Sequence, residues 1–158
     1  MRFWLAKLIA TFFYTGLSPK MPGTVGSIAA ALLFIPVLHS TSFAEKGYIL
    51  YATLLLGCLA TEIYIRTVVK LDPREVVIDE VFAVWLLIAI NYEVFPGLAP
   101  WIICVVSCAL FRVFDIMKPF PINIVDKNVH GTLGIMLDDV MAAGMAFAVF
   151  WVIFKFAI

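Results

Sequence analysis

Five long apolar segments alternate with short polar loops along the chain. Several of their purely apolar stretches are shorter than the roughly 20 residues that a helix needs to cross a bilayer, so polar turns must extend these helices or some segments are re-entrant. The first segment has the weakest case for a full span. The segments are Ser27 to about Phe43, Tyr48–Val69, Pro73–Asn91, Leu98–Met117 and Ile135–Ile158. This pattern predicts an all-α, multi-pass membrane helical bundle of about five apolar helices.

The residues ahead of the first segment predict one further helix. Arg2 precedes an apolar stretch at Leu8–Phe13, but Lys7 interrupts it and no small-residue cleavage site follows, which argues against a cleaved signal peptide. We expect a retained N-terminal helix at the membrane interface. The chain contains neither an internal repeat nor a low-complexity segment, so residues 1–158 predict a single integral-membrane domain.

Composition supports a membrane protein and excludes one class of partner. Hydrophobic residues make up 64% of the 158 residues and mean hydropathy is +1.06, which is more apolar surface than a soluble domain of this length can bury. The net charge is zero and no basic stripe is present, so nucleic acid is not an expected partner. The three cysteines lie inside apolar segments and lack a metal-binding spacing, so we expect them to pack as small apolar side chains. They are Cys58, Cys104 and Cys108.

Charged residues gather on one side of the membrane if all five segments cross it. Of the 11 basic residues, only Lys46 and Lys155 fall on the other side, so the positive-inside rule makes the basic side cytoplasmic. That rule does not predict the acidic residues that gather on the same side. They are Glu62, Asp72, Glu75, Asp79, Glu80, Asp115, Asp126, Asp138 and Asp139.

Helix-end chemistry accounts for part of this acidic excess. The sequence Asp72-Pro-Arg-Glu75 predicts a helix start, with Asp72 as the N-cap, proline at the first position and a reciprocal acidic residue three along. Asp79 and Glu80 then fall nearly two turns inside the predicted helix, where capping cannot explain them. A solvated helix face is the structural alternative for this pair.

The fourth and fifth segments carry the remaining charged candidates. Arg112 and Asp115 share a helical face, as a local ion pair or as functional groups, and the chain turns out of the helix at Lys118 before proline. Asp138 and Asp139 are adjacent near a helix start, where the helix dipole explains one carboxylate but not both.

Carboxylates gathered at one rim repel one another unless a positive charge lies among them. Oxygen ligands without a companion His or Cys cluster favour Mg²⁺ over zinc or copper. Arg112 and Lys118 would then hold an anionic group, Arg112 through its bidentate fork and Lys118 as a point charge.

A glycine-rich loop leads into the first segment. Residues Gly16–Ser27 include three glycines, two prolines and three hydroxyl side chains. Such a loop can direct backbone N–H groups and a helix N-terminus at a phosphate. It lacks the Gly-Lys-Ser/Thr ending of a P-loop, so an ordinary tight turn is an equal alternative.

These motifs together resemble the phosphatidylglycerophosphatase A family in order and spacing, from about Gly16 to Gly144. They are Gly16-Leu-Ser-Pro19, Pro22-Gly-Thr-Val-Gly-Ser27, Asp72-Pro73 with Val76-Val-Ile-Asp-Glu80 and Trp85, Phe111-Arg-Val-Phe-Asp-Ile-Met-Lys-Pro-Phe-Pro121, and Gly134-Ile-Met-Leu-Asp-Asp139. The sequence departs from the family pattern at Ala83 and Ala143, where glycine is usual, and each change adds a methyl group one turn beyond the carboxylates. The resemblance implies a multi-pass inner-membrane, Mg²⁺-dependent lipid phosphatase that converts the phospholipid phosphatidylglycerophosphate to phosphatidylglycerol.

On this resemblance we assign roles for metal-assisted hydrolysis. Asp115 would orient or deprotonate the attacking water, while Arg112 and Lys118 balance transition-state charge. Asp79, Glu80, Asp138 and Asp139 are the predicted metal ligands. The predicted substrate-binding residues are Ser18, Lys20, Thr24, Gly26 and Ser27.

The sequence motifs of other catalytic mechanisms are absent from this chain. No Cys-x5-Arg or Asp-x-Asp-x-Thr nucleophile motif is present, and His39 and His130 do not form the paired-histidine motifs of other lipid phosphatases, so direct attack by water is expected. His130 could still donate a proton to the leaving oxygen. A CDP-alcohol phosphatidyltransferase would need an Asp-Gly-x2-Ala-Arg signature, which is absent. A small membrane transporter or lipid-binding scaffold without catalysis is the remaining alternative.

Overall fold

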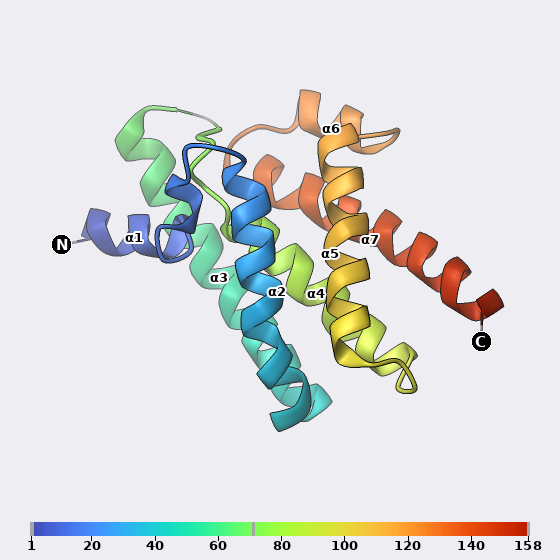
Figure 1. Cartoon of the computed structure of the whole chain (residues 1–158). Coiled ribbons are helices and arrows are strands. Elements are labelled where there is room, and N and C mark those ends of the chain that lie inside the picture. Colours follow the sequence, from blue (N-terminus) through green and yellow to red (C-terminus); the bar gives the residue numbers. More distant parts are fainter. Residues whose placement is uncertain (1, 71, 158) are drawn as a thin grey trace.

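The computed structural model describes residues 2–70 and 72–157, and the described chain is helical with no strand (Figure 1). The elements are α1 (Arg2–Ala10), a short 3-10 helix η1 (Thr15–Leu17), α2 (Pro22–Ser40), α3 (Phe43–Val68), α4 (Ile78–Val94), α5 (Pro100–Met117), α6 (Ile122–Asn128) and α7 (Gly131–Ala157). The predicted all-α bundle is confirmed, and its five apolar segments correspond to α2, α3, α4, α5 and α7. The predicted end of the last segment, Ile158, lies outside the described residues.

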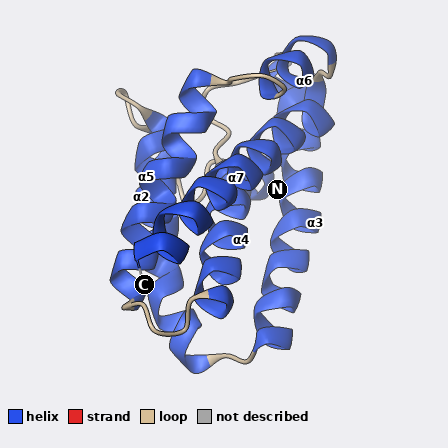
Figure 2. Ribbon diagram, turned by 90° about the vertical axis from the view of Figure 1, so that its right-hand side faces the viewer, coloured by secondary structure: helices blue, strands red, loops and turns tan. Residues whose placement is uncertain are grey.

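Four of these helices are long and apolar enough to cross a membrane: α2, α3, α5 and α7. The first apolar segment, α2, is among them. Helix α4 has only 17 residues and is buried on nearly every side, because it contacts α2, α3, α5 and α7. Figure 2 shows α7 crossing over α4, with α3 on one side and α5 on the other. A helix that is apolar all round is expected to occupy the centre of a bundle.

An ion pair lies at the end of the bundle that is opposite to the start of α4. The Nζ atom of Lys46, at the start of α3, lies 3.0 Å from Glu93 Oε1 near the end of α4. The same amine donates to the carbonyl oxygen of Thr41, just after α2. Helices α2 and α4 therefore run in one direction and α3 in the other, as the predicted alternation of loops requires.

The predicted start of α4 is wrong. The helix begins at Ile78, and its N-cap residue, Val77, makes no side-chain cap. The backbone N–H of Val77 instead donates to the carbonyl of Ala10 at 2.9 Å, which ties the preceding segment to the end of α1. Tertiary contact thus overrides the local capping signal at Asp72, and Asp79 and Glu80 lie in the first turn of the helix.

The predicted N-terminal helix is present as α1 and packs on α3. Ala6 and Ala10 are buried, and the rings of Phe3 and Tyr64 stack with centroids 5.9 Å apart. Its location at a membrane interface stays a prediction. By holding Val77, α1 helps to set where α4 begins.

Candidate active site

A cavity of about 590 Å³ opens where the N-terminal ends of α2, α4 and α7 meet the C-terminal end of α5 and α6. We call it the acidic cavity. Its charged or hydrogen-bonding side chains are Thr24, Asp72, Arg74, Asp79, Glu80, Arg112, Asp115, Lys118, Asp126, His130, Asp138 and Asp139. All of the predicted metal ligands and catalytic residues therefore line one cavity, although they come from three helices and the turn after α5.

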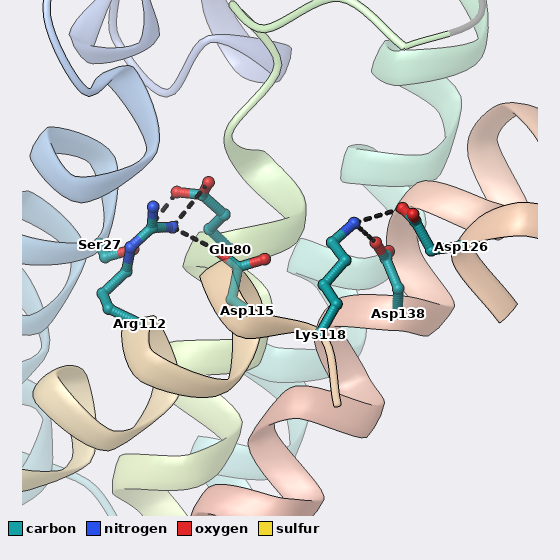
Figure 3. Close-up of polar contacts among 7 residues, drawn as sticks. All are labelled: Ser27, Glu80, Arg112, Asp115, Lys118, Asp126 and Asp138. Carbon is teal, nitrogen blue, oxygen red and sulfur yellow. Dashed lines mark hydrogen bonds and ion pairs between the residues drawn. The ribbon is translucent and has the colours of Figure 1, made fainter. Parts of the chain in front are cut away.

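Arg112 connects two of these helices. Its Nη1 atom lies 2.6 Å from Asp115 Oδ2 on the same helix and 3.0 Å from Glu80 Oε1 on α4 (Figure 3). The local pair was one predicted alternative, and the contact with Glu80 shows that the arginine also bridges elements. The Nε atom of Arg112 is buried without a hydrogen-bond partner among the described residues.

Lys118 forms the second charged bridge. It ends α5 in the left-handed conformation, with φ of 40°. Its Nζ atom lies 2.5 Å from Asp138 Oδ2 on α7 and also pairs with Asp126 on α6 (Figure 3). Burial alone would lower the pKa of Lys118, but the hydrogen bonds accepted by Asp126 and Asp138 outweigh it and raise that pKa above its usual value. The ammonium group is therefore charged at neutral pH.

Asp126 is a cavity residue that the sequence-based assignment missed. It was included only among the acidic residues on one side of the membrane. Its position depends on α6, which folds back after Pro119 and Pro121 so that Asp126 meets Lys118. The only signal in the sequence was membership of that acidic group.

Three carboxylates in the cavity have an oxygen that is buried and lacks a partner in the described part of the chain: Asp79 Oδ1, Asp138 Oδ1 and Asp139 Oδ2. Buried polar atoms normally find a partner, because leaving them without one costs free energy. Hard oxygen atoms in this state suit a hard cation such as Mg²⁺ in their chemistry. No three His, Cys, Asp or Glu side chains among the described residues are already arranged as a metal site.

The start of α2 forms another wall of the cavity. Met21, Pro22, Gly23 and Thr24 line it, and the Thr24 hydroxyl is buried without a partner among the described residues. The unpaired N–H groups of a first helical turn carry partial positive charge. This wall can therefore interact favourably with an anion.

The other residues predicted to bind substrate lie outside the cavity lining. Ser27 donates to Glu80 Oε2 at 3.3 Å, and Gly26 is packed against Val77. Ser18 donates to the carbonyl of Lys20, whose side chain is exposed. Of the five residues predicted to bind substrate, Thr24 lines the cavity, and the neighbouring Gly23, which also lines it, was not among the predicted site residues.

The two departures from the family pattern are accommodated in the core. Ala83 is fully buried in α4, and Ala143 is almost fully buried in α7. Both methyl groups lie about one turn beyond the carboxylates, within the packed helices. His130 lines the cavity from the loop before α7, and its role as a proton donor stays a prediction.

Comparisons with known proteins identify clear relatives. The family model described as Phosphatidylglycerophosphatase A matches residues 8–154. A Phosphatidylglycerophosphatase A from Haemophilus influenzae is 36% identical over 139 residues, covering 86% of this chain and 80% of the relative. One from Escherichia coli is 33% identical over 139 residues, covering 85% and 75%. A Putative phosphatidylinositol-3-phosphatase from Bacteroides thetaiotaomicron is 36% identical over 152 residues, covering 91% and 90%. No solved structure gives a significant match.

Proposed function

The chain belongs to the phosphatidylglycerophosphatase A family, and from that premise we propose that it hydrolyses the terminal phosphate of phosphatidylglycerophosphate by Mg²⁺-assisted attack of water. It is a membrane enzyme, a phosphatidylglycerophosphatase. A transporter or scaffold without catalysis does not fit membership of an enzyme family. The products would be phosphatidylglycerol and inorganic phosphate.

The proposed mechanism rests on two features that lie together in the acidic cavity. One is a set of carboxylate oxygens without a hydrogen-bond partner, and the other is a set of cationic side chains held in place by ion pairs. Asp79, Asp138 and Asp139 each have an oxygen available to a ligand. Mg²⁺ usually takes one or two carboxylates together with water and substrate phosphate oxygens. A cage of three side chains is therefore not required before the substrate arrives.

We assign metal binding chiefly to the three aspartates. Glu80, the fourth predicted ligand, is already shared by Arg112 and Ser27 and would coordinate an ion only by exchanging one of these contacts. When bound, the ion would polarise the phosphoryl group and lower the pKa of a water molecule.

The chain's own groups would supply the remaining chemistry. Asp115 would orient the water and accept its proton as the new P–O bond forms and the bond between phosphorus and the glycerol oxygen breaks. The departing glycerol oxygen would then take up a proton from Asp115 or from His130, which also lines the cavity. Arg112 and Lys118 would stabilise the charge on the phosphoryl oxygens. The start of α2 would add backbone N–H donors to the same phosphate.

The test is phosphate release by the full chain in detergent. Purified protein should release inorganic phosphate from phosphatidylglycerophosphate with Mg²⁺, and release should stop when EDTA is added and return with excess Mg²⁺. Glu45→Gln, at the far end of the bundle, is a matched control because glutamine preserves the capping box with Ser42. Folded protein that releases no phosphate would contradict the proposed reaction, and release that is indifferent to EDTA would contradict the metal.

A second substrate is favoured by one comparison. The relative from Bacteroides thetaiotaomicron carries the name of a phosphatidylinositol-3-phosphatase. Phosphatidylinositol 3-phosphate also bears a terminal phosphate monoester, so the same cavity could act on it. Parallel assays with both lipids would decide between them by kcat/KM.

We also propose that the acidic cavity opens on the cytoplasmic side of the inner membrane. Arg74, Arg112 and Lys118 line it, whereas Lys46 lies at the opposite end of the bundle. This distribution agrees with the positive-inside rule. Labelling of single cysteines placed at the exposed residues 74 and 47 in intact cells, in a chain without its native cysteines, would test the orientation.

A further inference from the structure

A second cavity, of about 550 Å³, lies beside the acidic cavity between the end of α3 and the start of α7. We call it the basic cavity. Its lining includes Glu62, Arg66, Val69, Lys70, His130 and Thr132. None of them was assigned a part in the proposed hydrolysis, apart from the possible proton donor His130.

The two cavities adjoin, because His130 and Gly131 line both. Gly131 has a φ of +72°, and a Cβ atom built on it would meet no atom within 4 Å. Apart from the two neighbouring residues in the chain and the adjacent backbone of α7, no described atom therefore lies within 4 Å of that position. This open position lies where the linings of the two cavities meet, so space is available beside Gly131 to a ligand with two anionic groups.

The basic cavity carries a net positive charge, because Arg66 and Lys70 outnumber Glu62, the one carboxylate in its lining. Glu62 accepts from the Thr132 hydroxyl at 2.6 Å and from Arg66 Nε at 2.5 Å. Arg66 uses only Nε for this contact, so both Nη groups remain, and Lys70 forms no ion pair with the described residues. The guanidinium group and the amine suit a phosphate anion.

The rim of the basic cavity is apolar and exposed. Val69 and Leu133 are among the most exposed apolar side chains, at 89% and 74%. They stand at the ends of α3 and α7, two helices suited to crossing a membrane. A cationic cavity with such a rim fits the phosphate of a lipid, whose acyl chains can leave toward the bilayer.

We propose that the basic cavity binds the phosphodiester of the lipid substrate while the terminal phosphomonoester occupies the acidic cavity. This inference rests on the proposed function. It makes Arg66 and Lys70 specificity residues that distinguish a lipid with two phosphates from a lipid with a single phosphomonoester.

Steady-state kinetics provide the first test. Lys70→Gln and the double variant Arg66→Gln/Lys70→Gln should raise KM for phosphatidylglycerophosphate, about tenfold in the double variant, with kcat within about twofold. Hydrolysis of phosphatidate, which lacks the phosphodiester, should not change. Lys127→Gln is the matched control, since Lys127 is an exposed lysine on α6 that lines neither cavity.

A binding measurement separates this inference from the proposed reaction. Short-chain phosphatidylglycerol carries only the phosphodiester, and its affinity for detergent-solubilised protein should fall about tenfold in the double variant. Binding of inorganic phosphate should stay the same, which distinguishes a lipid headgroup from free phosphate. Lys70→Gln leaves the Glu62 contacts intact, so it remains informative if the double variant fails to fold.

Unchanged phosphatidylglycerol binding and unchanged KM in Lys70→Gln and the double variant would overturn the inference. An equal loss with phosphatidate would overturn it as well, because the effect would then not depend on the phosphodiester. Wild-type protein that binds phosphatidylglycerol in this manner but releases no phosphate would instead contradict the proposed function and leave the cavity assignment standing.

Discussion

Gly23 lies so close to Glu80 that a Cβ atom on residue 23 would come within 1.9 Å of Glu80 Oε1. The missing side chain lets the first turn of α2 approach the carboxylate that also receives Arg112. The obstructing atoms belong to the end of a flexible side chain and not to backbone. An added methyl group would therefore move the carboxylate before it disturbed the fold.

Gly23→Ala should lower kcat about a hundredfold while leaving thermal unfolding nearly unchanged. A displacement of about 1 Å in positioned groups is enough for a loss of this order. Phosphate release and thermal unfolding in detergent measure the two effects. Gly47→Ala is the control, because a Cβ there meets nothing within 4 Å. Full activity of Gly23→Ala would show that the position of Glu80 does not matter for catalysis.

Replacement of Arg112 should cost more activity than replacement of Lys118. Arg112 forms ion pairs with both Glu80 and Asp115, and its side chain is 16% exposed, whereas that of Lys118 is 30% exposed. Arg112→Ala should reduce kcat about a thousandfold, at the upper end for loss of one charge-stabilising donor group. Arg112→Lys, which keeps the charge but not the fork, should recover only part of the loss. Equal activity of the lysine and arginine enzymes would exclude a role for bidentate geometry.

The gathering of carboxylates at one end of the bundle was predictable because each apolar segment reverses the direction of the chain. That alternation alone places Asp79, Asp115 and Asp139 at the same end of the bundle, without knowledge of side-chain contacts. The start of α4 was not predictable in this way. Its local sequence contains a good capping signal at Asp72, but the hydrogen bond from Val77 to Ala10 joins residues far apart in sequence.

Cross-helix contacts were equally hidden from the sequence. The spacing of Arg112 and Asp115 predicts their local pair, but the contact with Glu80 depends on how α4 and α5 pack. Asp126 meets Lys118 only because α6 folds back after α5. The Gly23 contact likewise needs the approach of α2 to α4. These relationships arise from packing between elements, for which a single sequence carries no direct signal.

Lys118→Gly and Lys118→Ala should separate stability from function. Both remove the amine that meets Asp138, so both should lower kcat by a similar factor of about ten to a hundred. Residue 118 has φ of 40°, a conformation that glycine adopts without the cost of about 1 kcal/mol borne by alanine. The glycine variant should therefore unfold at a higher temperature than the alanine variant. Matching unfolding temperatures would show that this backbone conformation does not strain the protein.

Asp139→Asn should abolish turnover without lowering stability in the absence of metal. Asp139 is buried at 4% exposure, lines the same cavity as three other predicted ligands, and has an oxygen without a partner in the described chain. Asparagine removes one of several like charges at nearly constant volume, so folded protein should be recovered in wild-type yield with an equal or higher unfolding temperature in EDTA. Added Mg²⁺ should raise the unfolding temperature of the wild-type protein and have a smaller effect on the variant, because binding to the folded state alone is stabilising. Phosphate release and unfolding with and without Mg²⁺ provide the measurements. A variant that retains turnover, or that responds to Mg²⁺ as the wild type does, would remove Asp139 from the set of metal ligands.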